Sequence, residues 1–169
     1  QNLSFPEAVT QLAELAGMTI PKDTPEDERR EKVVKDILGA NVEAAKFFRE
    51  MLHRKNGQHA LSYLERRGVS DKARQTFGLG YAPGSRTALR DHLINQDFPL
   101  ELLVEAGLVI KPDDGGQPYD KFRDRLMFPI MGRRGVIAFG GRALSADVQA
   151  KYMNSPETAL FHKSHTLYH

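Results

Sequence analysis

The stretch 151–163, KYMNSPETALFHK, concentrates residue types that bind phosphates and nucleotides. It holds two cations, an aromatic ring and a side-chain amide, namely Lys151, Tyr152, Asn154 and Lys163. Ser155 followed by Pro156 is typical of a helix start, so we expect a helix here whose first N–H groups face solvent and bind a phosphate. The alternative is an ordinary helix start beside a turn.

A second basic set lies upstream, in KFRDRLMFPI and AFGGR. If residues 121–130 form a strand, its two-residue period places Lys121, Arg123 and Arg125 on one face, about 7 Å apart. A row of cations at this spacing can follow a nucleic-acid backbone, and arginine binds phosphate through two parallel hydrogen bonds. Arg142 follows two glycines that would let a ligand backbone approach. The alternative is the polar outer face of a half-buried sheet.

Positive charge collects in the last third of the chain. Residues 121–169 carry eight Lys and Arg but three Asp and Glu, whereas the whole chain of 169 residues has a net charge of +2. Arg67, near a helix end in YLERRG, either complements the helix dipole or extends the basic surface. The asymmetry indicates a polyanionic partner, and the alternative is a solvated basic face without a partner.

The same region is poor in metal ligands. Metal-assisted phosphoryl transfer needs clustered carboxylates. Residues 121–169 offer three acidic side chains: Asp124, Asp147 and Glu157. Three histidines have helical spacing, but no local carboxylate or cysteine completes a site with His162, His165 and His169. We therefore expect no metal site and no catalytic residue, and a chain that binds a polyanion without transforming it.

Composition and the start of the chain restrict the class of protein further. There is no cysteine, which excludes disulfides and cysteine-based zinc sites. No apolar run approaches the roughly 20 residues of a membrane span, and the start has no secretory signal pattern. We expect a cytoplasmic protein without a membrane partner. The first residue is Gln rather than Met, so we also expect a piece of a longer protein.

The elements that must position these residues change character along the chain. LSFPEAVTQLAELAG predicts a helix, and the polar, proline-containing stretch to residue 23 predicts a linker. From the cap at Thr24, apolar spacing predicts a long helix to about residue 54, then several shorter helices. FPIMGRRGVIAF predicts a hairpin with glycines at its turn. We expect an α+β fold, with a helical first half and a small, mainly antiparallel sheet in the second.

Five segments, in fixed order, strongly resemble bacterial replicative DNA primase of the DnaG type: YLERRG, FGLGYAP, YDKFRDRLMFPI, GVIAFGGR and KYMNSPETALFHKSHTLY. Roughly residues 25–169 resemble the N-terminal subdomain of the RNA polymerase core of these primases. The opening helix is similar to the end of the zinc-binding domain. The resemblance therefore implies that residues 1–23 are a helix and linker from that domain, and that residues 24–169 are the core subdomain.

The resemblance implies part of an enzyme that synthesises RNA primers, a nucleotidyltransferase. This piece would bind single-stranded DNA template and help to position ribonucleotides. The positions that match the family's DNA-contacting residues are Arg67, Lys121, Arg123 and Arg142. Those that match its nucleotide and primer–template residues are Lys151, Tyr152, Asn154 and Lys163. The family often has Arg where this chain has Lys121, so the charge is kept and the two-pronged hydrogen bond is lost.

In the family, a downstream TOPRIM subdomain carries the acidic residues that bind Mg²⁺ or Mn²⁺, and an upstream zinc ribbon binds Zn²⁺. A C-terminal domain contacts the replicative helicase at the replication fork, in the nucleoid. The resemblance thus implies that this piece binds neither metal and is inactive alone. Two alternatives stay open: a stand-alone single-stranded nucleic-acid-binding module, and a nucleotide-binding regulatory domain whose Lys151–Lys163 region binds a phosphorylated small molecule.

Overall fold

The computed structural model describes residues 5–17 and 24–163 and divides into two units, residues 1–32 and 33–169. In the first unit, α1 (Phe5–Leu15) confirms the helix predicted at the start of the chain. The cap proposed at Ser4 and the linker at 18–23 lie outside the described residues. The proposed boundary at residue 23 remains a prediction.

The long helix α2 (Pro25–His53) begins at the predicted cap. Asp27 N donates to Thr24 Oγ1 at 3.2 Å, and Thr24 N donates to the Asp27 carboxylate at 3.0 Å. This reciprocal pair satisfies N–H groups that a helix start otherwise leaves unpaired. From Val34 onward, one face of α2 is buried in the second unit, which accounts for its apolar spacing.

Short helices follow α2 in the order that the sequence predicts: η1 (Lys55–Gly57), α3 (Gln58–Arg66), α4 (Asp71–Thr76), α5 (Ala88–Ile94) and α6 (Leu100–Glu105). Gly68, at a φ of 73°, lets the chain leave α3 in the left-handed conformation. Ser70 then caps α4 by accepting a hydrogen bond from Ala73 N at 3.2 Å. Both residue types are typical of these positions, so the local sequence accounts for the end of α3 and the start of α4.

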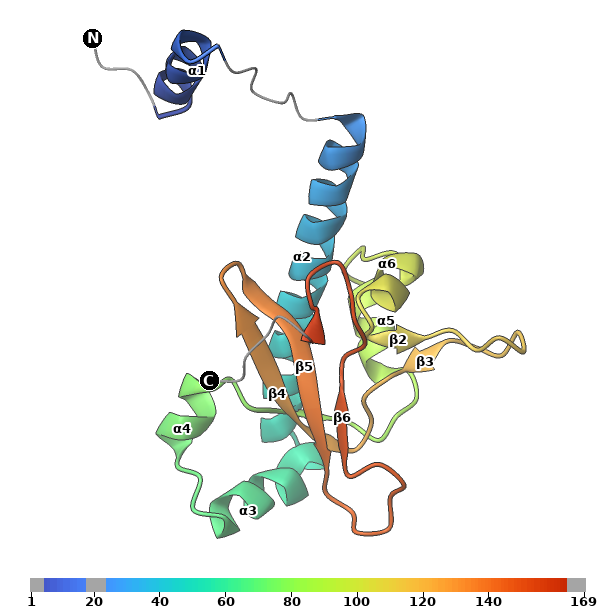
Figure 1. Cartoon of the computed structure of the whole chain (residues 1–169). Coiled ribbons are helices and arrows are strands. Elements are labelled where there is room, and N and C mark those ends of the chain that lie inside the picture. Colours follow the sequence, from blue (N-terminus) through green and yellow to red (C-terminus); the bar gives the residue numbers. More distant parts are fainter. Residues whose placement is uncertain (1–4, 18–23, 164–169) are drawn as a thin grey trace. The chain divides into compact units, whose positions relative to one another are not determined.

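The second unit contains a four-stranded antiparallel sheet in the order β1-β4-β5-β6. Its strands are β1 (Gly80–Ala82), β4 (Arg125–Gly132), β5 (Gly135–Ala143) and β6 (Tyr152–Asn154). A separate ribbon pairs β2 (Val109–Ile110) with β3 (Tyr119–Asp120). The β4–β5 hairpin confirms the predicted turn at residues 133–134. The α+β fold is therefore confirmed (Figure 1).

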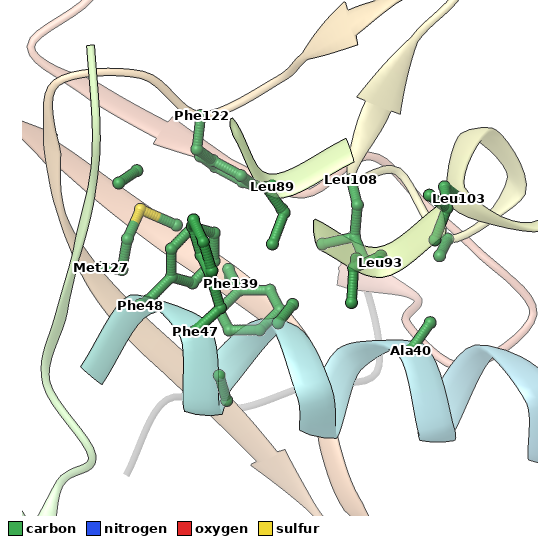
Figure 2. Packing of buried hydrophobic residues seen from close by; sticks show 14 of the residues in the cluster. Ala40, Phe47, Phe48, Leu89, Leu93, Leu103, Leu108, Phe122, Met127 and Phe139 are labelled. Atoms are coloured by element: carbon green, nitrogen blue, oxygen red, sulfur yellow. The ribbon is translucent and has the colours of Figure 1, made fainter. Parts of the chain in front are cut away.

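One face of the sheet packs against α2 and the short helices α5 and α6. Figure 2 shows Phe47 and Phe48 of α2 within a cluster that also holds Phe139 of β5 and Leu93 of α5. The rings of Phe48 and Phe139 meet edge to face, with centroids 5.4 Å apart. Burying a phenylalanine of this kind stabilises the fold by about 2–3 kcal/mol. This core fixes β5 and, through it, every functional residue of the sheet.

On the other face of the sheet, the described residues form two smaller hydrophobic clusters. At one end, Leu64 of α3 packs with Leu126 of β4. At the other end, Phe161 packs with Ile130 and Ala138. The same face also carries Arg142 of β5 and, on β6, Tyr152 and Asn154, which the sequence analysis singled out.

None of the helices in the described part of the chain combines the length and the apolar character that a membrane span requires.

Candidate nucleic-acid interface

Two arginines and two tyrosines form a stack between α3 and the sheet. On β5, Arg142 lies opposite Tyr152 of β6, so both side chains share one face. Tyr63 and Arg67 are four residues apart on α3 and therefore also share a face. We call Tyr63, Arg67, Arg142 and Tyr152 the arginine–tyrosine stack.

The contacts within the stack are cation–π contacts. Arg142 Cζ lies 4.9 Å from the ring centroid of Tyr63 and 6.0 Å from that of Tyr152. Arg67 Cζ lies 5.5 Å from the Tyr63 centroid, and Arg67 Nε donates to the Tyr63 hydroxyl at 3.1 Å. Each contact of this kind contributes about 0.5–1 kcal/mol at an exposed site. The rings therefore hold the guanidinium groups in place without neutralising them.

The pKa of Tyr152 is affected by the positive charges around it. Its ring is 68% exposed. A hydrogen bond to Arg142 and the charge of that guanidinium lower the pKa of the Tyr152 phenol, and the charges of Lys151 and Arg67 act in the same direction. Three predicted cations and the predicted aromatic residue are thus close enough to interact. An exposed ring among cations is the arrangement that binds single-stranded nucleic acid, through base stacking and phosphate contacts.

The predicted strand face with Lys121, Arg123 and Arg125 is wrong. Strand β4 begins only at Arg125, and residues 121–124 form an irregular link because Asp124 has a φ of 47°. Arg125 is 7% exposed, and burial lowers the pKa of its guanidinium. Its Nη1 donates to the carbonyl of Lys151 at 3.4 Å. Arg125 therefore supports β6 from inside rather than extending a row of surface cations.

Lys121 lies near Lys163, at the end of the stretch 151–163. Burial lowers the pKa of the Lys121 ammonium, and the nearby charge of Lys163 lowers it further. The two ammonium groups are therefore close enough for their charges to interact. The structure thus brings together two predicted residues that are 42 positions apart in sequence.

Arg123 is held at the base of the β2–β3 ribbon. Its Nη1 donates to the carbonyl of Asp120 at 2.6 Å, and its Cζ lies 4.9 Å from the ring centroid of Tyr119. Arg86 approaches the same ring, with its Cζ at 4.7 Å. Arg123 is therefore oriented by its own loop and does not belong to the arginine–tyrosine stack.

The helix start predicted at Ser155 and Pro156 is also wrong. Ser155 is 1% exposed and continues the pairing of β6 with β5. Its N–H donates to the carbonyl of Phe139 at 2.8 Å, and its hydroxyl accepts from Phe139 N at 2.9 Å. The Ser-Pro pair therefore ends a strand, and no α-helix follows among the described residues up to 163.

Packing explains why the residues after Ser155 form a turn and not a helix. The ring of Pro156 lies where a side chain on Gly107 would stand, since a Cβ built there would be 2.5 Å from Pro156 Cδ. Thr158 Oγ1 then accepts from Leu160 N and Phe161 N, both at 3.1 Å, which closes a tight turn. Asn154, paired across the sheet with Gly140, stays exposed on the same face as Tyr152.

Within residues 5–17 and 24–163, no three His, Asp or Glu side chains lie together as metal ligands would. Two of the histidines considered from sequence, His165 and His169, lie outside the described residues.

Sequence reasoning missed Tyr63, the ring that joins both arginines of the stack. A signal was present, because Tyr63 precedes Arg67 by four residues within a predicted helix. It also missed Arg86 and Tyr119, which meet through the fold and not through any spacing in the sequence.

The comparisons with known proteins agree on one family. Residues 47–169 match the family described as "DNA primase catalytic core, N-terminal domain". A DNA primase of Pseudomonas putida is 41% identical over 174 residues, which cover 99% of this chain and 26% of that protein. The chain thus spans about a quarter of the length of the curated relatives it matches.

Solved structures give the same result. A DnaG primase catalytic domain bound to single-stranded DNA has a TM-score of 0.72 at 34% identity, covering 78% of this chain and 41% of that one. The zinc-binding and RNA polymerase domains of an Aquifex aeolicus primase have a TM-score of 0.66 at 32% identity, covering 95% of this chain and 38% of that one.

Proposed function

The chain belongs to the family of bacterial DnaG-type primase catalytic cores, as their N-terminal domain, and from this premise we propose that it holds single-stranded template for RNA primer synthesis. The parent protein would be a DNA primase, a nucleotidyltransferase that copies DNA into RNA primers for replication. The observation that carries the proposal is the arginine–tyrosine stack on the open face of the sheet.

The stack combines the two interactions that a single strand needs. Arg67 and Arg142 offer guanidinium groups to phosphates, and Tyr152 offers an exposed ring to a base. Lys151, exposed and next in sequence to Tyr152, adds a further phosphate contact. Stacking tolerates every base and phosphate contacts carry no sequence information, so these contacts bind template with little sequence preference.

The lysine pair, Lys121 and Lys163, suits the phosphates of a ribonucleotide or of the primer end. Asn154 lies between Tyr152 and Lys163 in sequence, and its amide can donate to and accept from a sugar or base edge. Arg123 contributes charge beside the same template path. These side chains bind and orient their ligands, and none of them transfers a proton or a phosphoryl group.

The chemistry itself would need groups beyond this chain. Mg²⁺ or Mn²⁺ on a TOPRIM subdomain would supply the charge stabilisation of phosphoryl transfer. Zn²⁺ would belong to the zinc-binding domain, and the replicative helicase to a C-terminal domain of the parent, at the bacterial replication fork. The chain alone should therefore make no primers when supplied with these divalent metals and four ribonucleotides, and robust synthesis would contradict this division.

Residues 1–23 would be the end of the zinc-binding domain with its linker, and residues 24–169 the core subdomain. The Aquifex structure, which includes a zinc-binding domain, covers 95% of this chain, against 78% for the catalytic domain alone. This difference supports the division.

A salt series tests template binding. The chain is titrated against a labelled single-stranded oligonucleotide, and anisotropy is recorded at several salt concentrations. Phosphate contacts by Arg67, Arg123, Arg142 and Lys151 predict a slope of log K against log salt of about −3, at about 0.7 per contact. Affinity that does not depend on salt, or binding no better than to a neutral polymer, would contradict the proposal.

A further inference from the structure

One carboxylate stands at the basic surface in an unusual conformation. Asp124 has a φ of 47°, which non-glycine residues adopt rarely and which Asp and Asn tolerate best. Its Oδ1 accepts from the Tyr81 hydroxyl at 2.8 Å and lies 3.4 Å from His59 Nε2. The Asp124 side chain is nevertheless 49% exposed. The carboxylate is thus fixed in direction and open to solvent.

Contacts made by α3 show that Asp124 lies close to the arginine–tyrosine stack. His59, Tyr63 and Arg67 are spaced four residues apart and share one face of that helix. His59 lies beside Asp124, and Tyr63 lies beside Arg142 of the stack. One helical turn, about 6 Å along the axis, therefore separates the carboxylate from the arginine–tyrosine stack.

The sheet gives the same placement independently. Tyr81 of β1, Leu126 of β4, Arg142 of β5 and Tyr152 of β6 are successive cross-strand neighbours and share a face. Tyr81, whose hydroxyl donates to Asp124, is therefore in the same row as Arg142 and Tyr152 of the stack. In sequence, Asp124 stands between two arginines, Arg123 and Arg125.

A carboxylate in this setting distinguishes the parts of a nucleotide. It repels phosphate, which the neighbouring cations attract. It accepts hydrogen bonds from exocyclic amino groups of bases, as Asp and Glu do from cytosine N4. Oδ1 is engaged by Tyr81 and His59, whereas Oδ2 has no hydrogen bond within the described residues of this chain. Oδ2 is therefore the acceptor available to a ligand.

We propose that Asp124 is a base-selecting residue, whose Oδ2 accepts a hydrogen bond from the amino group of a template base held next to the arginine–tyrosine stack. The stack binds any base, and Asp124 adds a preference for cytosine and adenine over thymine and uracil. Thymine and uracil present a carbonyl oxygen at the corresponding position, and two acceptors facing one another repel. This inference rests on the proposed binding of single-stranded template.

The test compares two oligomers that differ in the hydrogen-bonding edge of the base, at C4 and N3. Oligo-dC and oligo-dU of about 12 nucleotides have the same backbone and ring size. Cytosine has an amino group at C4, whereas uracil has a carbonyl there and a proton on N3. Anisotropy titrations of the whole chain at one salt concentration should give at least about ten-fold tighter binding to oligo-dC, the size expected of one hydrogen bond to a charged acceptor.

The variant Asp124→Asn keeps a residue that tolerates this backbone conformation and an oxygen for Tyr81, and it removes the charge. An amide accepts and donates, so the ratio of the two affinities should fall toward one. Affinity for oligo-dU should stay the same or rise, because a repulsive charge has gone.

Asp97→Asn is the matched control. Asp97 is also exposed with a positive φ, 65°, but it lies in the connection between α5 and α6. The same change there should leave the affinity ratio at its wild-type value. Equal wild-type affinity for both oligomers, or a preference that survives in Asp124→Asn, would overturn the inference while template binding stands. Binding of neither oligomer would overturn the proposed function, and the inference with it.

Discussion

Replacing Arg142 with alanine should weaken single-stranded DNA binding about ten-fold. Its guanidinium is held by Tyr63 and Tyr152 on the open face of the sheet and can reach one phosphate. A hydrogen bond to a charged partner contributes about 1.5–3 kcal/mol, and each 1.4 kcal/mol is about a factor of ten in affinity. Losing one phosphate contact should also make the salt slope less negative by about 0.7.

The same substitution should disturb the fold only slightly. Its two ring contacts are partly exposed, so their loss should lower the free energy of unfolding by about 1 kcal/mol. For a chain of this size, that change corresponds to a fall in Tm of about 2–4 °C. Thermal unfolding followed by circular dichroism measures this shift, and anisotropy titration of the same samples measures binding.

Arg133→Ala is the control for charge alone. Arg133 is exposed in the turn between β4 and β5. Along β5, the distance from Gly135 to Arg142 is about 23 Å. Removing this cation should change affinity less than about two-fold, because its interaction with bound DNA is screened at such range. An equal loss in both variants, or a large loss of stability in Arg142→Ala with unchanged affinity, would refute the reasoning.

Three further outcomes follow from the contacts of other residues. In an ultraviolet titration, Tyr152 should ionise below its ordinary pKa, and Arg142→Ala should move that pKa upward; an unmoved titration would contradict the contact. Burial raises the pKa of Asp120 to about 6, so its stabilising effect should be complete below about pH 4 and lost as pH rises through 6. Denaturant unfolding across this range should show that loss in the wild type, and a loss of equal size in Asp120→Asn would contradict it. Ser155→Ala should lower the unfolding free energy by about 1–2 kcal/mol, because the N–H of Phe139 loses its acceptor, and should leave the salt slope unchanged. Reduced affinity with normal stability would contradict this structural role and indicate that Ser155 contacts the bound DNA.

Much of the fold was predictable because its signals are local. Thr24, Ser70 and Gly68 mark helix ends through hydrogen bonds and backbone conformations that each residue creates within a few positions. The β4–β5 hairpin follows from two apolar runs on either side of a glycine-flanked turn. These elements needed no knowledge of the rest of the chain.

The errors arose where distant residues decide local structure. Ser155 and Pro156 have the sequence of a helix start, but Phe139 and Gly107 provide a strand partner and a packing site that local propensity does not contain. Likewise, the strand expected from Lys121 starts four residues later, because Asp124 is held in a positive-φ conformation by Tyr81, 43 residues earlier in the chain.

The candidate site was predictable as a set of residues and not as an arrangement. Charge and composition identified Arg142, Lys151 and Tyr152, whose proximity the β5–β6 pairing explains. Tyr63 joins them from α3, an element far away in sequence, so only the folded chain reveals its role. Arg125 was instead predicted at the surface because arginine is usually exposed, but in the folded chain it is buried.

Chemical-shift mapping of the isotope-labelled chain with a single-stranded oligonucleotide tests the central claim most directly. If the arginine–tyrosine stack holds the template, the largest backbone amide shifts should fall on residues 59–67 of α3 and on residues 140–154 of β5 and β6. Residues of α5 and α6 should remain unaffected. Shifts that cluster on those two helices or around Arg133, with none on the stack, would contradict the account.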